Sequence, residues 1–162
     1  IQDIKKYFKC SNKEILIRIE SLMKDNKTFE KENKKIKRLV QTSKVNELVN
    51  SADQLGKVRL VVTKLDDIVD LKGMGDQFRQ TFQINGIALV GTVYNGKPMV
   101  MCTVTDDLVS EIKAGKVVKE IGTMMGGGGG GKDHLATAGG TDASHLNDIL
   151  DKGREYIKSL LK

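Results

Sequence analysis

The sequence predicts an α/β protein in which a long, coiled-coil-like helical arm precedes a two-layer α/β unit with a glycine-rich loop. Three observations lead to this fold class. No glycine or proline occurs in residues 11–55, so nothing interrupts a long helix there. Residues 58–104 contain β-branched apolar runs and an Asn-Gly turn, which are typical of strands and a hairpin. Residues 126–131 are six consecutive glycines, where we expect a loop.

The predicted arm helix covers residues 11–41. Ser11 and Asn12 are suitable N-cap residues, and Glu14 completes a capping box with Ser11. About 30 helical residues span ~45 Å, which is more than a small globular core needs. The arm is therefore expected to pack along another helix.

Apolar residues of the arm follow a 4-3 spacing, which indicates a coiled-coil seam or an antiparallel helical arm. The residues of this seam are Ile15, Ile19, Leu22, Phe29, Ile36 and Val40. Asn26 and Asn33 occupy the two remaining steps, where asparagine weakens packing but fixes register and partner number. A homodimer through the arm is one expectation, and a solvent-exposed spacer helix is the alternative.

The chain is expected to divide near Gly56. A second, short helix is predicted over residues 45–55, and the glycine provides a helix stop after it. The predicted domains are a helical arm, residues 1–56, and a globular α/β unit, residues 57–162.

Periodicity orders the globular unit as strand, helix, strand, strand and helix, followed by the glycine loop and a last helix. The predicted ranges are 58–65, 71–82, 87–94, 99–104, 111–125 and 146–161. The hairpin is the clearest element, because Asn95-Gly96 between two apolar runs is typical of a two-residue turn with positive φ. Pro98 begins the return strand, where a missing donor is tolerated. Candidate N-caps of the first and last helices are Asp66, Asp67, Thr141 and Asp142.

Charge and composition narrow the function classes. The net charge is +6, and the whole excess lies in residues 1–57, which carry 14 Lys and Arg against 8 Asp and Glu. This excess indicates either a surface that binds a polyanion or a lysine-rich solvated helix. Aromatic residues make up 4% and Trp is absent, so a base-stacking surface is not expected.

Cysteine usage and hydropathy bear on the compartment. Cys10 and Cys102 have neither disulfide nor metal spacing, and we predict free thiols in a reducing, cytoplasmic setting. No run approaches the roughly 18 apolar residues of a transmembrane helix, so no membrane partner is expected. The first residue is not Met and no signal peptide follows it, so we expect a piece of a longer protein.

Residues 126–140 require a chemical explanation, because they hold eight of the 17 glycines. Six consecutive glycines lose much conformational entropy on ordering, so a folded domain keeps them where the backbone must be bare. Bare amides cradle an anion or admit a bulky polymer, and Lys132 adds a positive charge beside them. A flexible linker is the alternative.

Two phosphate-binding motifs match poorly. The glycines satisfy G-x-G-x-x-G only because every residue there is glycine, and a helix rather than a strand is predicted before them. The P-loop pattern fails at Asp133, where Ser or Thr must hold magnesium. No catalytic constellation is evident, and His134 and His145 are expected to be structural or surface residues.

The segment GGGGGGKDHLATAGG resembles the Gly-rich motif of the C-terminal domain of alanyl-tRNA synthetases. In that family a glycine cluster precedes a basic residue, an alanine and a glycine pair, which here are Gly126 to Gly131, Lys132, Ala136 and Gly139-Gly140. Many members have Arg-Pro after the glycines, where this chain has Lys132-Asp133.

Other features extend the resemblance over nearly the whole chain. Family members carry a Lys/Glu-rich helical arm, a strand ending in a Leu-Asp pair, a hairpin, and a Lys-rich helix with an Ala-Gly step. The matching residues are Leu65-Asp66 after the first strand and Ala114-Gly115-Lys116 in the helix. The segment over residues 68–83 is shorter than in the family.

The resemblance implies a DHHA1-type domain, also called C-Ala, that binds alanine tRNA at its elbow. It would link aminoacylation and editing without a catalytic site of its own. The parent would be an alanine–tRNA ligase using ATP, Mg and, in its editing domain, Zn, so its partners are alanine tRNA and the other synthetase domains. The tRNA-binding residues so implied are Gly126, Gly127, Gly128, Gly129, Gly130, Gly131, Lys132, His134, Lys113 and Lys116.

Two other functions stay open. The same module follows DHH phosphodiesterases and nucleases, where it binds the substrate, and that reading requires an upstream Asp-His-His metal cluster. A coiled-coil oligomerisation module, in which the globular unit only caps the arm, is the third hypothesis.

Overall fold

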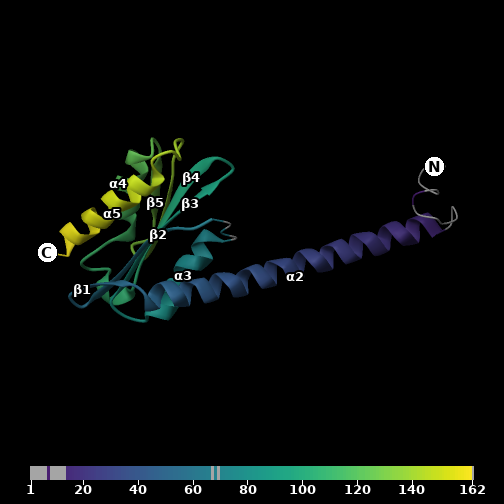
Figure 1. The fold of residues 1–162 in the computed structure, drawn as a ribbon, viewed down its shortest axis with the longest axis horizontal. Helices are drawn as coiled ribbons and strands as arrows, with labels where there is room; N and C mark the ends of the chain where they lie inside the picture. Colours follow the sequence, from purple (N-terminus) through teal and green to yellow (C-terminus); the bar gives the residue numbers. More distant parts are fainter. Residues whose placement is uncertain (1–6, 8–13, 67, 69, 162) are drawn as a thin grey trace. The chain divides into compact units, whose positions relative to one another are not determined.

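The computed structural model describes residues 7, 14–66, 68 and 70–161 (Figure 1). The chain forms two compact units, Ile1–Leu39 and Val40–Lys162. Ser11 and Asn12, the candidate caps of the arm, lie outside the described residues, as does Cys10. Within the described part, no helix has the length and apolarity needed to cross a bilayer.

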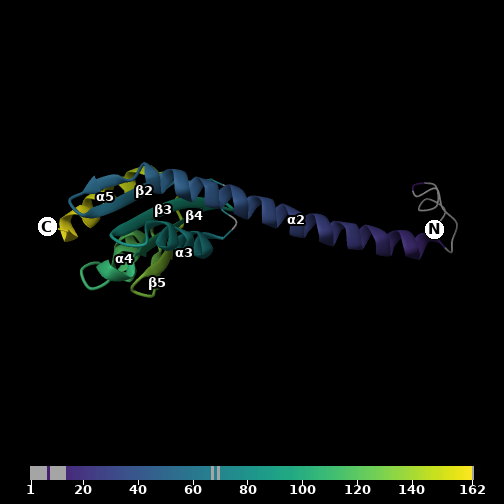
Figure 2. The ribbon, with the colours of Figure 1, turned by 90° about the horizontal axis from the view of Figure 1, so that it is seen from below.

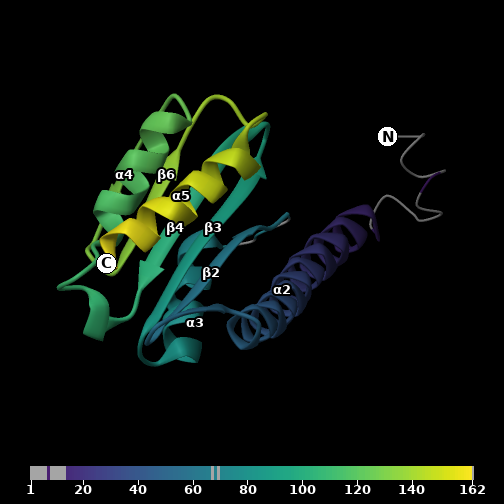
Figure 3. The same cartoon turned by 60° about the vertical axis from the view of Figure 1, so that its left-hand side comes forward.

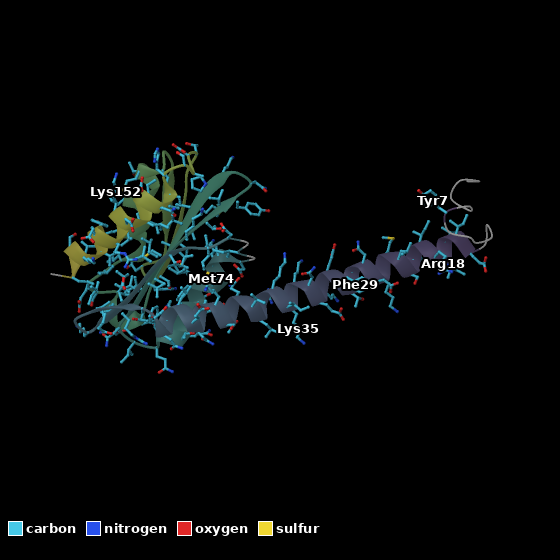
Figure 4. All side chains as sticks on the ribbon, in the orientation of Figure 1. Tyr7, Arg18, Phe29, Lys35, Met74 and Lys152 are labelled. Atoms are coloured by element: carbon cyan, nitrogen blue, oxygen red, sulfur yellow. The ribbon has the colours of Figure 1, made fainter. Side chains whose placement is uncertain are left out.

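The first unit is the N-terminal part of helix α2, which runs over Glu14–Asn50 and confirms the predicted long helix. Side chains leave this helix on all sides, among them Arg18, Phe29 and Lys35 (Figure 4). Of the apolar seam, Ile19, Leu22, Phe29, Ile36 and Val40 are exposed. Pairing of the arm with another helix therefore stays a prediction.

The prediction of a separate helix over residues 45–55 is wrong. Helix α2 continues without a break to Asn50, because nothing between residues 41 and 45 disrupts it and because Val45 and Val49 pack in a buried cluster. Residues Asp53–Leu55 form strand β1, which pairs antiparallel with β2, Val58–Lys64. Gly56, at φ 59°, serves the turn of this hairpin rather than a helix end.

The second unit holds a six-stranded mixed sheet in the order β1-β2-β3-β4-β6-β5. Strands β2 and β3, Gly86–Tyr94, are parallel and joined through helix α3, Leu71–Phe82. Strand β4, Lys97–Val104, returns antiparallel to β3 through the predicted turn, with Asn95 at φ 49° and Gly96 at φ 76°. The other two strands are β5, Gly128–Gly131, and β6, Leu135–Gly139.

Helices cover both faces of the sheet, so the unit has three layers where we expected two. Helices α4, Ala114–Met124, and α5, Leu146–Leu160, pack on one face (Figure 3). Helix α3 and the last turns of α2 pack on the other. Strand β3 is buried on both faces. Ile87 and Leu89 pack in a cluster with α4 and α5, and the alternate residues Ala88 and Val90 pack in a second cluster with α2 and α3. The α/β class itself is confirmed.

Helix α3 starts where we predicted, but its cap differs, and the start of α4 also differs from the prediction. Asp70, not Asp66, caps α3, since its side chain accepts a hydrogen bond from the Gly73 N–H at 2.9 Å; Asp67 lies outside the described residues. Helix α4 starts at Ala114 rather than at residue 111.

The last helix starts at Leu146, as predicted, but neither of its two candidate residues caps it. His145 is the N-cap residue of α5, without a side-chain capping bond. The Asp142 carboxylate instead accepts hydrogen bonds from the N–H and the hydroxyl of Ser144, at 2.9 and 2.6 Å. This local turn competes with capping, so Thr141 and Asp142 stay outside the helix.

Candidate nucleic-acid interface

The glycine run is an edge strand, not the loop we expected. Gly126, at φ +67°, and Gly127 lead the chain out of α4, and the Gly127 N–H donates to the Gly122 carbonyl at 2.9 Å. Gly128–Gly131 then pair antiparallel with β6 as strand β5. Hydrogen bonding to β6, and packing against α4 (Figure 2), offset the entropy lost by ordering glycine.

Three glycines of the run are glycine for internal reasons. A Cβ at Gly129 would lie 2.5 Å from the Ala138 Cβ, and a Cβ at Gly131 would lie 2.6 Å from the Ala136 Cα. A Cβ at Gly127 would collide with the backbone carbonyl of Gly139. These positions are bare because strand β6 lies against them.

Helix α4 also requires a glycine where it packs against β5. A Cβ at Gly122 would lie 2.9 Å from the backbone carbon of Gly128 and 3.2 Å from the Ala138 Cβ. The helix therefore packs on β5 with backbone close to backbone, which a larger residue at Gly122 would prevent.

Gly128 and Gly130 are different. A Cβ at either position would meet nothing within 4 Å, and neither residue has a positive φ. Nothing in the described chain requires glycine at these two positions. In the register of β5 and β6 they stand opposite Gly139 and Thr137, and so share a sheet face with them.

The edge of β5 also presents backbone donors. Lys132 and Leu135 exchange both hydrogen bonds across the turn, N to O at 2.9 and 3.3 Å. In a regular antiparallel ladder the next bonded pair is then Gly130 with Thr137, so the N–H groups of Gly129 and Gly131 point away from β6. Outward N–H groups on a strand without side chains favour an anion close to the backbone.

Of the predicted basic residues, Lys132 lies in the turn between β5 and β6, Lys113 contacts this turn, and Lys116 follows in the first turn of α4. Lys113, just before α4, forms an ion pair with Asp133 at 2.8 Å, so its charge is partly compensated. The Asp133 carbonyl also accepts from the Ala114 N–H at 2.7 Å, which ties the turn to α4. Within the described chain neither Lys116 nor Lys132 has an ion-pair partner within 4 Å, and both are exposed.

The two histidines lie in different places. His134 is half-buried in the turn, and its carbonyl accepts from the Val104 N–H at 2.9 Å and the Thr103 hydroxyl at 3.1 Å. His145 is exposed, with its Nδ1 3.6 Å from an oxygen of Asp148. Among the described residues no three His, Cys, Asp or Glu side chains gather as metal ligands would. Cys102 is a buried free thiol, as predicted, and burial raises its pKa to about 12.

Sequence reasoning missed a groove at the opposite end of β5. It measures about 530 Å³ and lies between the β3–β4 hairpin tip and the glycine segment. Its lining residues are Tyr94, Asn95, Lys97, Pro98, Met99, Gly127, Gly139, Gly140 and Thr141. The Gly140 N–H donates to the Pro98 carbonyl at 3.0 Å, which holds the two segments together. The only signal in the sequence was a tyrosine and a lysine flanking the Asn-Gly turn.

Comparison with known proteins agrees with this architecture. Residues 57–159 match the model of the DHHA1 domain. The chain belongs to the DHHA1 domain family. The match spans the sheet from the turn before β2 to the end of α5, so it contains the glycine strand and the groove of this DHHA1 domain.

The alignment with sequence relatives extends beyond the DHHA1 domain and includes the arm. The chain is 29% identical over 99% of its length to the alanine–tRNA ligase of Natranaerobius thermophilus, and 30% identical over 99% to that of Acetivibrio thermocellus. It spans only 19% and 18% of these relatives. The resemblance predicted from the glycine motif is confirmed.

A solved structure shows the same fold. The C-Ala domain from Aquifex aeolicus alanyl-tRNA synthetase matches with a TM-score of 0.58 at 20% identity. The match covers 68% of this chain and 96% of that domain.

Proposed function

We propose that this chain is the tRNA-binding C-terminal part of an alanyl-tRNA synthetase, and that it contacts RNA through strand β5. The observation that carries the proposal is the open face at Gly128 and Gly130, where glycine has no internal cause. A strand that must admit a ligand against its backbone explains it. The relatives, aligned over 99% of the chain, supply the ligand class.

The geometry fits a phosphate-rich ligand. The N–H groups of Gly129 and Gly131 at the edge donate to phosphate oxygens, and no Cβ on the open face keeps the ligand away. Lys132 and Lys116 add charge at one end of the strand, beside His134. Lys113 contributes less, because Asp133 already pairs with it.

The finer parts of the proposal follow from the family. The chain contacts the elbow of alanine tRNA, where the D and T loops meet, and connects the aminoacylation and editing domains on one tRNA. Bond-making chemistry, with ATP, Mg and Zn, belongs to those other domains. The protein acts in the cytoplasm, where tRNA is charged.

A tRNA titration tests the proposal. Alanine tRNA and a non-cognate tRNA, both as transcripts, are titrated against the chain at low and moderate salt. Binding of alanine tRNA supports the function, and comparison of the two transcripts measures specificity. Absence of binding to either tRNA at low salt would overturn it.

A further inference from the structure

The groove between the β3–β4 hairpin tip and the glycine segment holds the one aromatic side chain that is largely exposed in the described part of residues 40–161. Tyr94 is 64% exposed, whereas Phe78 and Phe82 are buried and Tyr156 is half-buried against the core. A tyrosine offers an apolar ring face and a polar hydroxyl, so an exposed tyrosine that lines a groove is suited to contact a ligand there.

Strand register places this ring on the same face as the open glycines. Tyr94 of β3 pairs with Lys97 of β4. Met99, two residues after Lys97 on β4, pairs with Gly139 of β6. Gly139 in turn stands opposite Gly128. Because directly paired and alternate residues share a face, the tyrosine, the lysine and the bare strand form one continuous surface.

The lining of the groove suits a flat ring with a charge beside it. Gly127, Gly139 and Gly140 bring three residues without side chains to the groove, so a planar group can approach the backbone. Met99 adds a polarisable apolar contact, and Lys97, another lining residue, brings a positive charge to the groove. In the described chain Lys97 has no ion-pair partner within 4 Å, so its charge is available.

We propose that this groove binds a single unstacked nucleobase of the RNA, stacked on the Tyr94 ring, with Lys97 on a neighbouring phosphate. The proposal rests on the proposed function for the presence of RNA at β5, and adds to it a base contact. The low aromatic content argues against a surface on which several bases stack, and a contact between one base and one tyrosine ring is consistent with that. A single ring next to a phosphate-binding strand holds one base where the backbone contacts alone carry no sequence information.

Paired variants separate stacking from charge. Tyr94→Leu is expected to weaken binding of alanine tRNA about tenfold, as loss of one stack does, and to leave the salt dependence unchanged. Tyr94→Phe keeps the ring and stays within about twofold of the parent chain. Lys97→Ala reduces the slope of log K against log salt by about one, whereas Lys152→Ala, an exposed lysine on α5, changes neither quantity.

A second probe removes the dependence on tRNA. The chain has three Tyr and no Trp, so tyrosine emission reports on stacking. A short single-stranded RNA is expected to quench the emission of the parent chain, and Tyr94→Phe is expected to remove most of that quenching. A fully paired RNA hairpin of equal length should quench neither protein.

The outcomes distinguish the two proposals. Circular dichroism first confirms that each variant is folded. Loss of affinity in Tyr94→Leu with an unchanged salt slope supports the base contact. Equal tRNA affinity of folded Tyr94→Leu and the parent overturns it, and leaves the proposed function standing if substitution at Gly128 still weakens binding. No binding of tRNA or single-stranded RNA by the parent overturns both.

Discussion

At the scale of single residues, the glycine run divides into two classes by alternation along β5. Gly127, Gly129 and Gly131 have neighbours that exclude a Cβ, and Gly128 and Gly130 have open space. The same residue type is thus required for two reasons, one internal to the fold and one external to it. Substitution tells them apart.

The first prediction concerns these two classes. Gly128→Gln with Gly130→Gln is expected to weaken tRNA binding at least tenfold with little change in melting temperature, because the new side chains enter open space in front of the backbone. Lys132→Ala should cost on the order of 1 kcal/mol of binding, as one charge-assisted contact does. Titration and thermal unfolding by circular dichroism provide the two readouts.

Gly129→Ala is the matched control. Its Cβ would lie 2.5 Å from the Ala138 Cβ, so it should destabilise the fold by about 1–3 kcal/mol through overpacking. If the folded Gly128 and Gly130 variant bound tRNA like the parent chain, β5 would not be the RNA contact.

The second prediction concerns Asp107, which supports a turn with unusual backbone angles. Its Oδ2 accepts from the Asn85 N–H at 2.9 Å, and Asn85 itself has φ 53°. Slight burial raises its pKa, but hydrogen bonds from the Thr105 hydroxyl and from the N–H groups of Asn85 and Asp107 itself, with the charge of Lys57, outweigh this and lower it. The charged carboxylate is therefore favoured in the folded state.

A lowered pKa means that this stabilisation is complete above the ordinary value of 3.8 and is lost as the pH falls through the folded value below it. Asp107→Ala should lower the free energy of unfolding by about 1 kcal/mol at pH 7. Urea unfolding at several pH values measures the difference between variant and parent. A difference that stays constant from neutral pH to well below 3.8 would contradict the role of the charge.

At the scale of elements, helix α2 carries two distinct faces. The apolar seam with Asn26 and Asn33 follows one heptad stripe. Basic residues follow another, at 3-4 spacing on the opposite side: Lys24, Lys27, Lys31, Lys34 and Arg38. The arm is thus able to pair through one face while it presents charge on the other.

The third prediction follows from the seam. The arm is expected to self-associate weakly as a two-stranded coil, because its apolar residues are exposed and asparagine limits packing. Asn26→Leu with Asn33→Leu should tighten association or change the number of chains. Sedimentation equilibrium over a range of concentrations measures this, and a monomer for both versions at high concentration would exclude pairing through the arm.

At the scale of the whole molecule, the sheet brings together segments that are distant in sequence. Strand β4 is central, with β3 on one side and β6 on the other, so Met99 and Gly139 become neighbours. The net charge of +6 is not spread over the chain, because the whole excess lies in residues 1–57, so an electrostatic attraction of a polyanion is expected mainly from that part.

The fourth prediction belongs to this scale. The affinity for tRNA is expected to fall steeply with salt, because several phosphate contacts release counterions. Replacing Lys24, Lys27, Lys31 and Lys34 by Gln should reduce the slope while costing less affinity at moderate salt than the Gly128 and Gly130 variant. Titrations at three salt concentrations provide the slopes. A flat response of the parent would contradict the electrostatic interpretation.

Local patterns in the sequence determined much of this protein. The long helix follows from an unbroken run without glycine or proline, and the β3–β4 turn from Asn95-Gly96, because such preferences act within a few residues. The glycine motif also indicated the family, because it reflects a requirement on the backbone itself.

Tertiary structure decided the rest. Glycine has no side chain to mark a strand, so only the free edge of β6 shows that residues 128–131 form β5. A positive-φ glycine suits a helix end and a hairpin equally, and pairing with β2 selected the hairpin at Gly56. The groove at Tyr94 exists because β4 and β6 adjoin, which no local preference encodes. What depends on a partner strand is visible only once the partner is in place.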